Sequence, residues 1–208
     1  MTISIDGQEI TQLETTGRTV GDILNEVRAS LLDHGRMIVT IICDGQTVTP
    51  DQITETLAQP VEKYSSIDFQ SADPNELLQN SLAACQEFMI AIRKDLAEVV
   101  DGFRQSRVQE AVKSMGPIFG LLNQMYQGVF GIFKLINRDP ESVEFSWGTA
   151  DQLFTGMVDQ LRQIKQSLEN NDYVQLADLL EYEMGTMLER WQELIDRMNT
   201  MVENADIE

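Results

Sequence analysis

The sequence predicts an α+β protein in which a small mixed domain, residues 1–72, precedes an all-α four-helix bundle of long antiparallel helices, residues 73–208. Two observations carry this prediction. Short β-favouring runs and Asp-Gly pairs fill the first third of the chain, whereas apolar residues at steps of three and four dominate after Asp73-Pro74. A chain of 208 residues is long enough for two such domains.

Two β-hairpins are predicted in residues 1–72. Asp6-Gly7 lies between isoleucine-rich runs, and Asp44-Gly45 lies between the run 38–42 and the run 47–49. A tight hairpin turn favours Asp-Gly because its central positions need a positive φ, which glycine adopts without strain. We therefore expect each pair to connect two antiparallel strands.

A helix is predicted between the hairpins. Apolar residues recur at helical spacing from Val20 to Leu32, Thr19 stands at the N-cap and Asp22 at the capping-box position. After the second hairpin, Thr49-Pro50 opens a shorter helical piece that continues through Leu57. Residues 66–69 are predicted to form a last strand.

The predicted order of elements, strand, strand, helix, strand, strand, short helix, strand, resembles the β-grasp or ubiquitin-like fold. Ubiquitin-like carriers act through a C-terminal Gly-Gly, whereas this chain continues beyond the last predicted strand and ends with residues 204–208, Asn-Ala-Asp-Ile-Glu. The resemblance therefore implies use of the fold as a docking module, without carrier chemistry.

Four helices are predicted after Asp73. A Gly116-Pro117 pair is expected to break or bend the second helix, because proline lacks the N–H that the helix interior uses. A polar linker around Asp139-Pro140 should separate the second helix from the third. The predicted ranges are 74–103, 106–137, 147–168 and 173–202.

The fourth helix raises the choice between a chemical site and a packing surface. Its apolar residues, from Val174 to Val202, fall on one stripe, and most of its carboxylates fall on the opposite face. A ferritin-like metal site needs a Glu-x-x-His pair from each of two helices, but His34 is the only histidine and lies in the other domain. Packing is the preferred interpretation, and no metal site is predicted. The methionines line either the core or an adaptable binding groove.

The formal charge of −19 narrows the range of partners. An acidic surface repels nucleic acid and anionic membranes, so neither is an expected partner, whereas a basic protein or a cation is attracted. The alternative interpretation is that the charge only keeps the protein in solution. Because the N-terminus has no basic segment followed by an apolar one, a cytoplasmic location is expected.

No catalytic residue and no cofactor are predicted. His34 follows Asp33 near the end of the first helix, where an imidazolium interacts favourably with the helix dipole. Cys43 and Cys85 have no basic neighbour in the sequence to lower their pKa, so inert thiols are expected.

The most apolar segment, residues 118–136, is interrupted by Asn123, Gln124, Gln127 and Lys134, which indicates a buried central helix rather than a membrane span. Where neighbouring helices leave it uncovered, a hydrophobic patch would mark a partner site. The candidate partner-binding residues are Phe119, Tyr126, Phe130, Phe133, Met184, Met187 and Trp191.

Three functions remain open from the sequence. The first is a non-enzymatic adaptor or chaperone-like protein that binds a partner, such as a helix, in a groove of the bundle or through the β-grasp-like domain. In general character, the helical part resembles secretion or flagellar export chaperones. The second is a self-associating structural protein whose fourth helix forms a homodimer. The third is an enzyme of unrecognised type.

Overall fold

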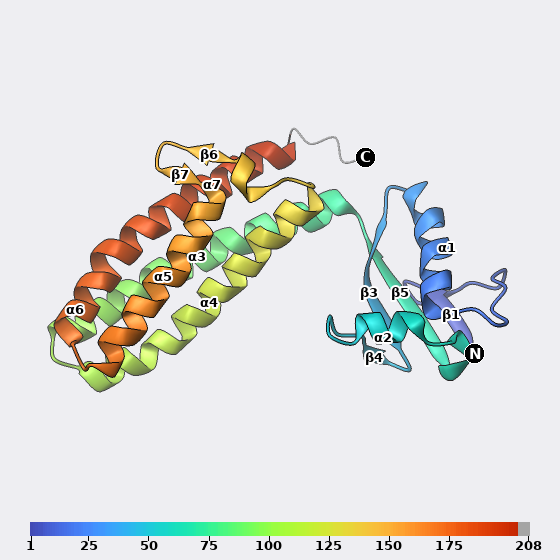
Figure 1. Ribbon diagram of the computed structural model, residues 1–208, viewed down its shortest axis with the longest axis horizontal. Helices are drawn as coiled ribbons and strands as arrows, with labels where there is room; N and C mark the ends of the chain where they lie inside the picture. Colours follow the sequence, from blue (N-terminus) through green and yellow to red (C-terminus); the bar gives the residue numbers. More distant parts are fainter. Residues whose placement is uncertain (204–208) are drawn as a thin grey trace. The chain divides into compact units, whose positions relative to one another are not determined.

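The computed structural model describes residues 1–203 and shows an α+β chain, as predicted. The chain divides into two compact units, Met1–Leu77 and Leu78–Glu208. The first contains a mixed sheet with its own helices, and the second contains the long helices (Figure 1). The boundary predicted between residues 72 and 73 lies slightly before the observed one, next to Pro74, where the first long helix begins.

The first unit is built on a five-stranded sheet in the order β2-β1-β5-β3-β4. The central strands β1 and β5 are parallel, and the other neighbours are antiparallel. The order of elements along the chain is the predicted one. The strands are β1 (Thr2–Ile5), β2 (Gln8–Glu9), β3 (Met37–Cys43), β4 (Gln46–Thr47) and β5 (Ser66–Ala72).

Both predicted hairpin turns are confirmed. Asp6 and Gly7 have φ values of 51° and 76°, and Asp44 and Gly45 have φ values of 49° and 77°. Positive φ at both central positions is the geometry that suits the twist of a two-residue hairpin. The turns connect β1 to β2 and β3 to β4.

Helix α1 (Val20–Leu32) provides most of the helical side of this unit's core. Alternate residues of the three longer strands are buried on one sheet face, because side chains of a strand point to opposite faces in turn. The short helix α2 (Ile53–Ala58) and the 3₁₀ turn η1 (Val61–Lys63) precede β5. The buried core comprises Ile3, Val20, Ile23, Leu24, Val27, Leu31, Ile41, Cys43, Val61, Ile67 and Phe69.

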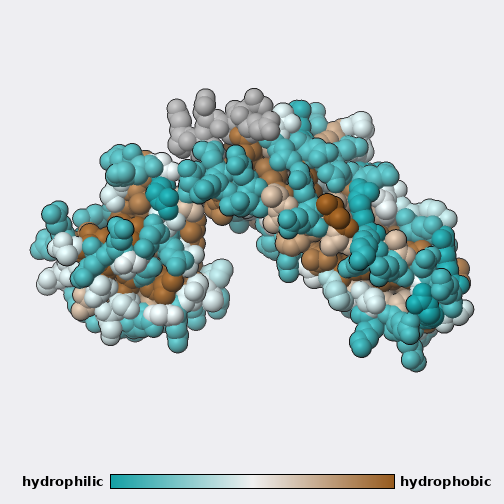
Figure 2. Space-filling view, turned by 180° about the vertical axis from the view of Figure 1, so that it is seen from behind, coloured by the Kyte–Doolittle hydropathy of each residue, from teal (hydrophilic) through white to brown (hydrophobic). Residues whose placement is uncertain are grey.

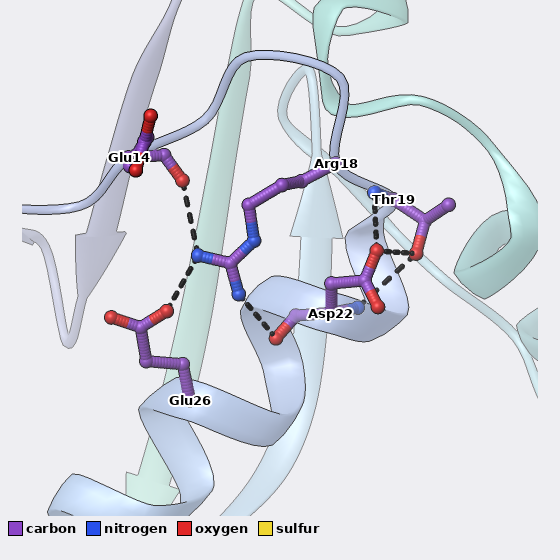
Figure 3. Close-up of polar contacts among 5 residues, drawn as sticks. All are labelled: Glu14, Arg18, Thr19, Asp22 and Glu26. Atoms are coloured by element: carbon purple, nitrogen blue, oxygen red, sulfur yellow. Dashed lines mark hydrogen bonds and ion pairs between the residues drawn. The ribbon is translucent and has the colours of Figure 1, made fainter.

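The predicted capping box fixes the start of α1 (Figure 3). The backbone N–H of Asp22 donates to Thr19 Oγ1 at 3.2 Å, and the backbone N–H of Thr19 donates to the Asp22 carboxylate at 2.9 Å. Arg18 reinforces this end by donating to the carbonyls of Glu14 and Asp22 and to the carboxylate of Glu26. Two otherwise unsatisfied N–H groups of the helix end are thus paired.

The described part of the second unit contains four helical rods, as predicted (Figure 1). Three rods are α3 (Pro74–Arg104), α4 (Val108–Leu135) and α5 (Ala150–Glu169). The fourth rod has three parts: α6 (Tyr173–Asp178), a π-helical turn η3 (Leu179–Glu183) and α7 (Met184–Glu203). All four rods contribute to one continuous apolar core.

Pro117 does not break the second helix, which was one of the two outcomes predicted for it. Helix α4 continues through it from Val108 to Leu135. Pro117 and Lys113, four residues earlier, are both exposed. Water can therefore reach the Lys113 carbonyl, which lacks the N–H of residue 117 as its helical partner, and the interruption of the hydrogen-bond ladder is tolerated.

The third helix begins at Ala150, slightly after the start predicted around Trp147. The 3₁₀ turn η2 (Pro140–Ser142) and a small hairpin, β6 (Glu144–Phe145) and β7 (Gly148–Thr149), precede α5. Trp147 lies in the turn of this hairpin and stacks on Phe145, with ring centroids 4.5 Å apart. The helix begins only at Ala150, behind a capping box of Thr149 and Gln152.

Val174 was predicted to face inward and is instead 76% exposed. The reason is η3, because a π turn holds more residues per turn than an α-helix and rotates the residues before it relative to those after it. Leu176 and Leu179 consequently face the core. From Met184 onward the predicted stripe is correct, and it is buried through Met198.

Apart from Val112, the exposed positions of α4 carry small or polar residues, including Gly116, Gly120, Gln124 and Lys134. The large apolar residues that are exposed elsewhere in this unit, such as Ile90, are separate along the sequence. Figure 2 shows apolar residues in small groups among hydrophilic ones on one face of the protein. Isolated exposed apolar residues are normal on a protein surface.

Candidate functional site

The seven candidate residues lie mainly in the core of the helical unit. Phe133, Met184, Met187 and Trp191 are buried, which agrees with packing as the main role of the fourth helix. Three further residues are half-buried and pack against this core: Phe119, Tyr126 and Phe130. Phe133, Met184 and Trp191 present no open surface to a partner, whereas Met187 also lines a groove that is described below.

An aromatic cluster explains this burial. Tyr126 contacts Phe154 edge-on at 5.3 Å between ring centroids and Trp191 at 6.5 Å, and Phe154 lies 5.5 Å from Trp191. Phe130 and Phe133 complete the cluster through Phe154. Sequence reasoning missed Phe154, the ring that joins α5 to the other two helices, although its position next to Leu153 and before Met157 already suggested an inward face.

Two buried polar atoms in this unit have no hydrogen-bond partner within residues 1–203: Nε1 of Trp191 and Nε2 of Gln160. Trp191 is fully buried beside other aromatic rings. Gln160 is 7% exposed and differs from Trp191 because it borders a groove. A buried donor without an acceptor costs about 1–3 kcal/mol, so such an atom calls for an explanation.

This groove runs between α5 and the fourth rod and is called here the α5–α7 groove. It is half-open to solvent and has a volume of about 440 Å³. Its α5 side extends from Gln152 to Gln163, about 16 Å along a helix. The lining residues are Gln152, Leu153, Gly156, Asp159, Gln160, Gln163, Tyr182, Glu183, Thr186, Met187 and Arg190.

Glycine leaves room in the middle of the α5–α7 groove. A Cβ built on Gly156 would meet no described atom within 4 Å. The apolar side chains of Leu153 and Met187 also line the groove, and both are almost completely buried. Methionine adapts its shape readily, so this part of the groove can accommodate apolar groups of different shapes.

The charges of the α5–α7 groove are unevenly distributed. The short turn at residues 170–172 joins α5 to the fourth rod, and the two run in opposite directions (Figure 1). Asp159 and Glu183 therefore come near one end of the groove and Arg190 near the other. Asp159 pairs with Arg162 at 2.7 Å. The guanidinium of Arg190 lies 5.6 Å from the ring centroid of Trp147, which holds it against the hairpin.

The π turn forms the acidic end of this groove. Its last two residues, Tyr182 and Glu183, line the groove, and Tyr182 is 62% exposed. The hydroxyl of Thr186 donates to the Tyr182 carbonyl at 2.9 Å. π turns occur frequently at functional sites, because the extra residue changes the direction of side chains within an otherwise regular helix.

A second groove, with a volume of about 370 Å³, lies on the α3 side of the fourth rod. Arg93 spans it by donating to the Leu188 carbonyl at 3.2 Å, and Arg104 spans it by pairing with Glu181. Its bridging polar groups are therefore already paired. The α5–α7 groove, with an unpaired amide, is the better candidate site.

His34 and the two cysteines are the other groups considered in the sequence. His34 is exposed at the end of α1, and its Nδ1 lies 2.9 Å from the Ser30 carbonyl. Both cysteines are free and buried. Burial raises the pKa of the Cys85 thiol to about 11, and burial together with the charge of Asp44 raises the pKa of Cys43.

Over residues 1–203, no group of three or more His, Cys, Asp or Glu side chains is placed to hold a metal ion. No helix in this range combines the length and apolar character that crossing a membrane requires.

The fold and groove define a two-unit α+β protein with a groove on its helical bundle. Residues 80–194, more than half of the chain, match the family model described as "Domain of unknown function (DUF8042)", and the chain belongs to this family. Residues 1–73 match the model described as "TP0873 N-terminal domain". Neither the curated proteins nor the solved structures gave a match. All residues of the α5–α7 groove lie within the larger match.

Proposed function

We propose that the protein is a non-enzymatic, cytoplasmic protein-interaction module of the adaptor or chaperone-like kind, which binds a segment of a partner in the α5–α7 groove. The observation that carries the proposal is the amide of Gln160, buried at the groove without a hydrogen-bond partner in the described chain. Rotation of the Gln160 side chain toward the groove would bring this buried amide within reach of a carbonyl of a bound segment, which supplies the missing acceptor.

The form of the groove favours a protein segment as the occupant. It extends over about 16 Å between two helices, which suits two to three turns of a docked helix. Its lining combines buried apolar side chains with amide and hydroxyl groups. The π turn and Gly156 keep it open, and both interrupt what would otherwise be regular packing of α5 on α7.

For the first unit we propose the β-grasp fold, on the basis of its observed strand order with parallel central strands. Its role in the proposal is that of a second docking surface. It would contribute to partner binding independently of the groove, because it forms its own compact unit with its own core.

A capture experiment with a matched pair of variants tests the proposed function. The full chain, Gly156→Leu and Gly120→Leu are used as baits in native lysate, and the retained proteins are compared by mass spectrometry. Both glycines are exposed on helices, and a Cβ on either would meet open space within the described structure. Only Gly156 lies in the groove.

The expected result is a protein retained by the full chain and by Gly120→Leu but lost with Gly156→Leu. A partner retained equally by all three baits contradicts the use of the groove. If no bait retains a protein above background, the proposed function is contradicted as a whole, and light scattering then tests self-association.

A further inference from the structure

We infer that the occupant of the α5–α7 groove is an amphipathic helical segment of a partner protein with basic side chains at the end that meets Glu183 and apolar side chains in the middle. This inference rests on the proposed function and specifies its partner. It follows from the hydrogen bonding, the shape and the charge of the groove, taken in turn.

The unpaired amide selects the type of acceptor. Nε2 of Gln160 needs an oxygen, which a carboxylate or an uncharged carbonyl can provide. A carboxylate of the partner beside Gln160 would come close to Asp159, the preceding residue of α5, and to Glu183 at the acidic end of the groove. The uncharged carbonyl of a peptide or of an amide side chain avoids that repulsion.

The open space at Gly156 selects an apolar anchor. It lies one turn before Gln160 on α5, and Leu153 and Met187 line the same groove. Burial of an apolar side chain gains roughly 25 cal/mol for each Å² removed from water. An apolar residue of the segment therefore fits the middle of the groove, next to the acceptor that pairs with Gln160.

The end of the groove that the π turn forms favours a basic residue of the partner segment. Glu183 is exposed there, Asp159 lies on the facing helix, and the exposed ring of Tyr182 offers a face for a cation. Arg162 partly neutralises Asp159, and Arg190 lies toward the opposite end against Trp147. The net charge of −19 adds long-range attraction for a basic segment.

Three synthetic peptides test the inference. Each has about 16 residues, enough for roughly four helical turns, with identical leucine positions and with lysine, glutamine or glutamate at the polar positions. Binding to the full-length protein is measured by fluorescence anisotropy of the labelled peptide. The site is located from amide chemical shifts, including the side-chain NH₂ of Gln160.

The lysine peptide is expected to bind about tenfold more tightly than the glutamine peptide, with the glutamate peptide weakest. Its affinity should fall about tenfold in Gly156→Leu and severalfold in Gln160→Leu and Glu183→Gln. Glu87→Gln, on the exposed surface of α3 outside the groove, changes the net charge equally and should leave the affinity unchanged. The Gln160 side-chain resonances should shift on binding.

If Glu183→Gln and Glu87→Gln lower the affinity for the lysine peptide equally, the binding reflects general charge attraction and the inference is overturned. Lysine-peptide binding that survives Gly156→Leu, or no binding of the lysine peptide, overturns it as well. If the glutamine peptide binds as tightly as the lysine peptide and is lost in Gly156→Leu, the basic partner is excluded while the groove as a protein-binding site stands. The capture experiment decides the proposed function independently.

Discussion

Gln160 and Gly156 lie one turn apart on α5 and line the same groove, one as a buried amide without a partner in the described chain and the other as a gap in the helix surface. Either feature alone weakens the packing of a helical bundle. Buried unpaired donors and helical glycines each cost stability, and their concentration at one groove is the pattern expected where stability is exchanged for binding.

Gln160→Met is expected to stabilise the protein. The change removes a buried unpaired amide and replaces it with an apolar side chain of similar length, which should raise the free energy of unfolding by about 1 kcal/mol. Urea unfolding of the wild type and the variant measures the difference. Gln163→Met, at an exposed position of the same groove, serves as the control and should change the stability little. A loss of stability in Gln160→Met would show that the amide has a packing role that methionine cannot replace.

Gly128→Ala is expected to destabilise the helical unit. A Cβ at Gly128 would lie 2.9 Å from Sγ of the buried Cys85, and overpacking of a core typically costs about 1–3 kcal/mol. Gly131→Ala is the matched control on the same helix. Its Cβ meets no described atom within 4 Å, and alanine favours the helix by up to about 1 kcal/mol.

A double-mutant cycle identifies the contact responsible. Cys85→Ala removes Sγ, so the cost of Gly128→Ala should be smaller in the Cys85→Ala background than in the wild type. Chemical denaturation of the four proteins gives the coupling free energy. If the free-energy costs of Gly128→Ala and Cys85→Ala are additive, α3 and α4 do not approach closely at this point.

The stability of the first unit is expected to fall at acid pH partly through Asp6. The backbone N–H and hydroxyl of Ser71 donate to its carboxylate at 2.7 Å each, and together with Arg36 they lower its pKa below 3.8. Because the folded-state pKa lies below the unfolded one, the contribution is present above the unfolded pKa and is lost as the pH falls through the folded pKa.

Asp6→Asn tests this pH dependence. Asparagine tolerates the positive φ of position 6, so the turn should form, while the charge that titrates is removed. The variant should be less stable at neutral pH, and the difference from the wild type should shrink as the pH is lowered below 4. Thermal unfolding at several pH values measures it. A constant difference across this range would exclude the Asp6 carboxylate as the titrating group.

Neither cysteine is expected to react in the native protein. Cys85 is almost completely buried, and with a pKa of about 11 only a very small fraction is thiolate at pH 8. Labelling with a thiol reagent at pH 8 should be slow before unfolding and complete after it. Fast labelling of Cys85 in folded protein would indicate that the α3–α4 packing opens readily.

The residues that sequence analysis placed correctly are those whose structure depends on near neighbours in the chain. Asp6-Gly7 and Asp44-Gly45 form hairpin turns, and Thr19 with Asp22 caps α1 as predicted. In each case backbone φ or a hydrogen bond over three residues determines the result. The apolar stripe after Met184 also needed only helical spacing.

The sequence by itself determined the α+β class, the order of the elements in the first unit and the four helical rods. Only the tertiary structure decided that the fourth rod contains a π turn, that Trp147 stacks on Phe145 in a hairpin, and that Gln160 lies buried beside open space at Gly156. Spacing along one helix gives the face that is buried, but not the helix that covers it. A groove arises where two faces fail to fill the space between them, so it depends on residues far apart in the chain.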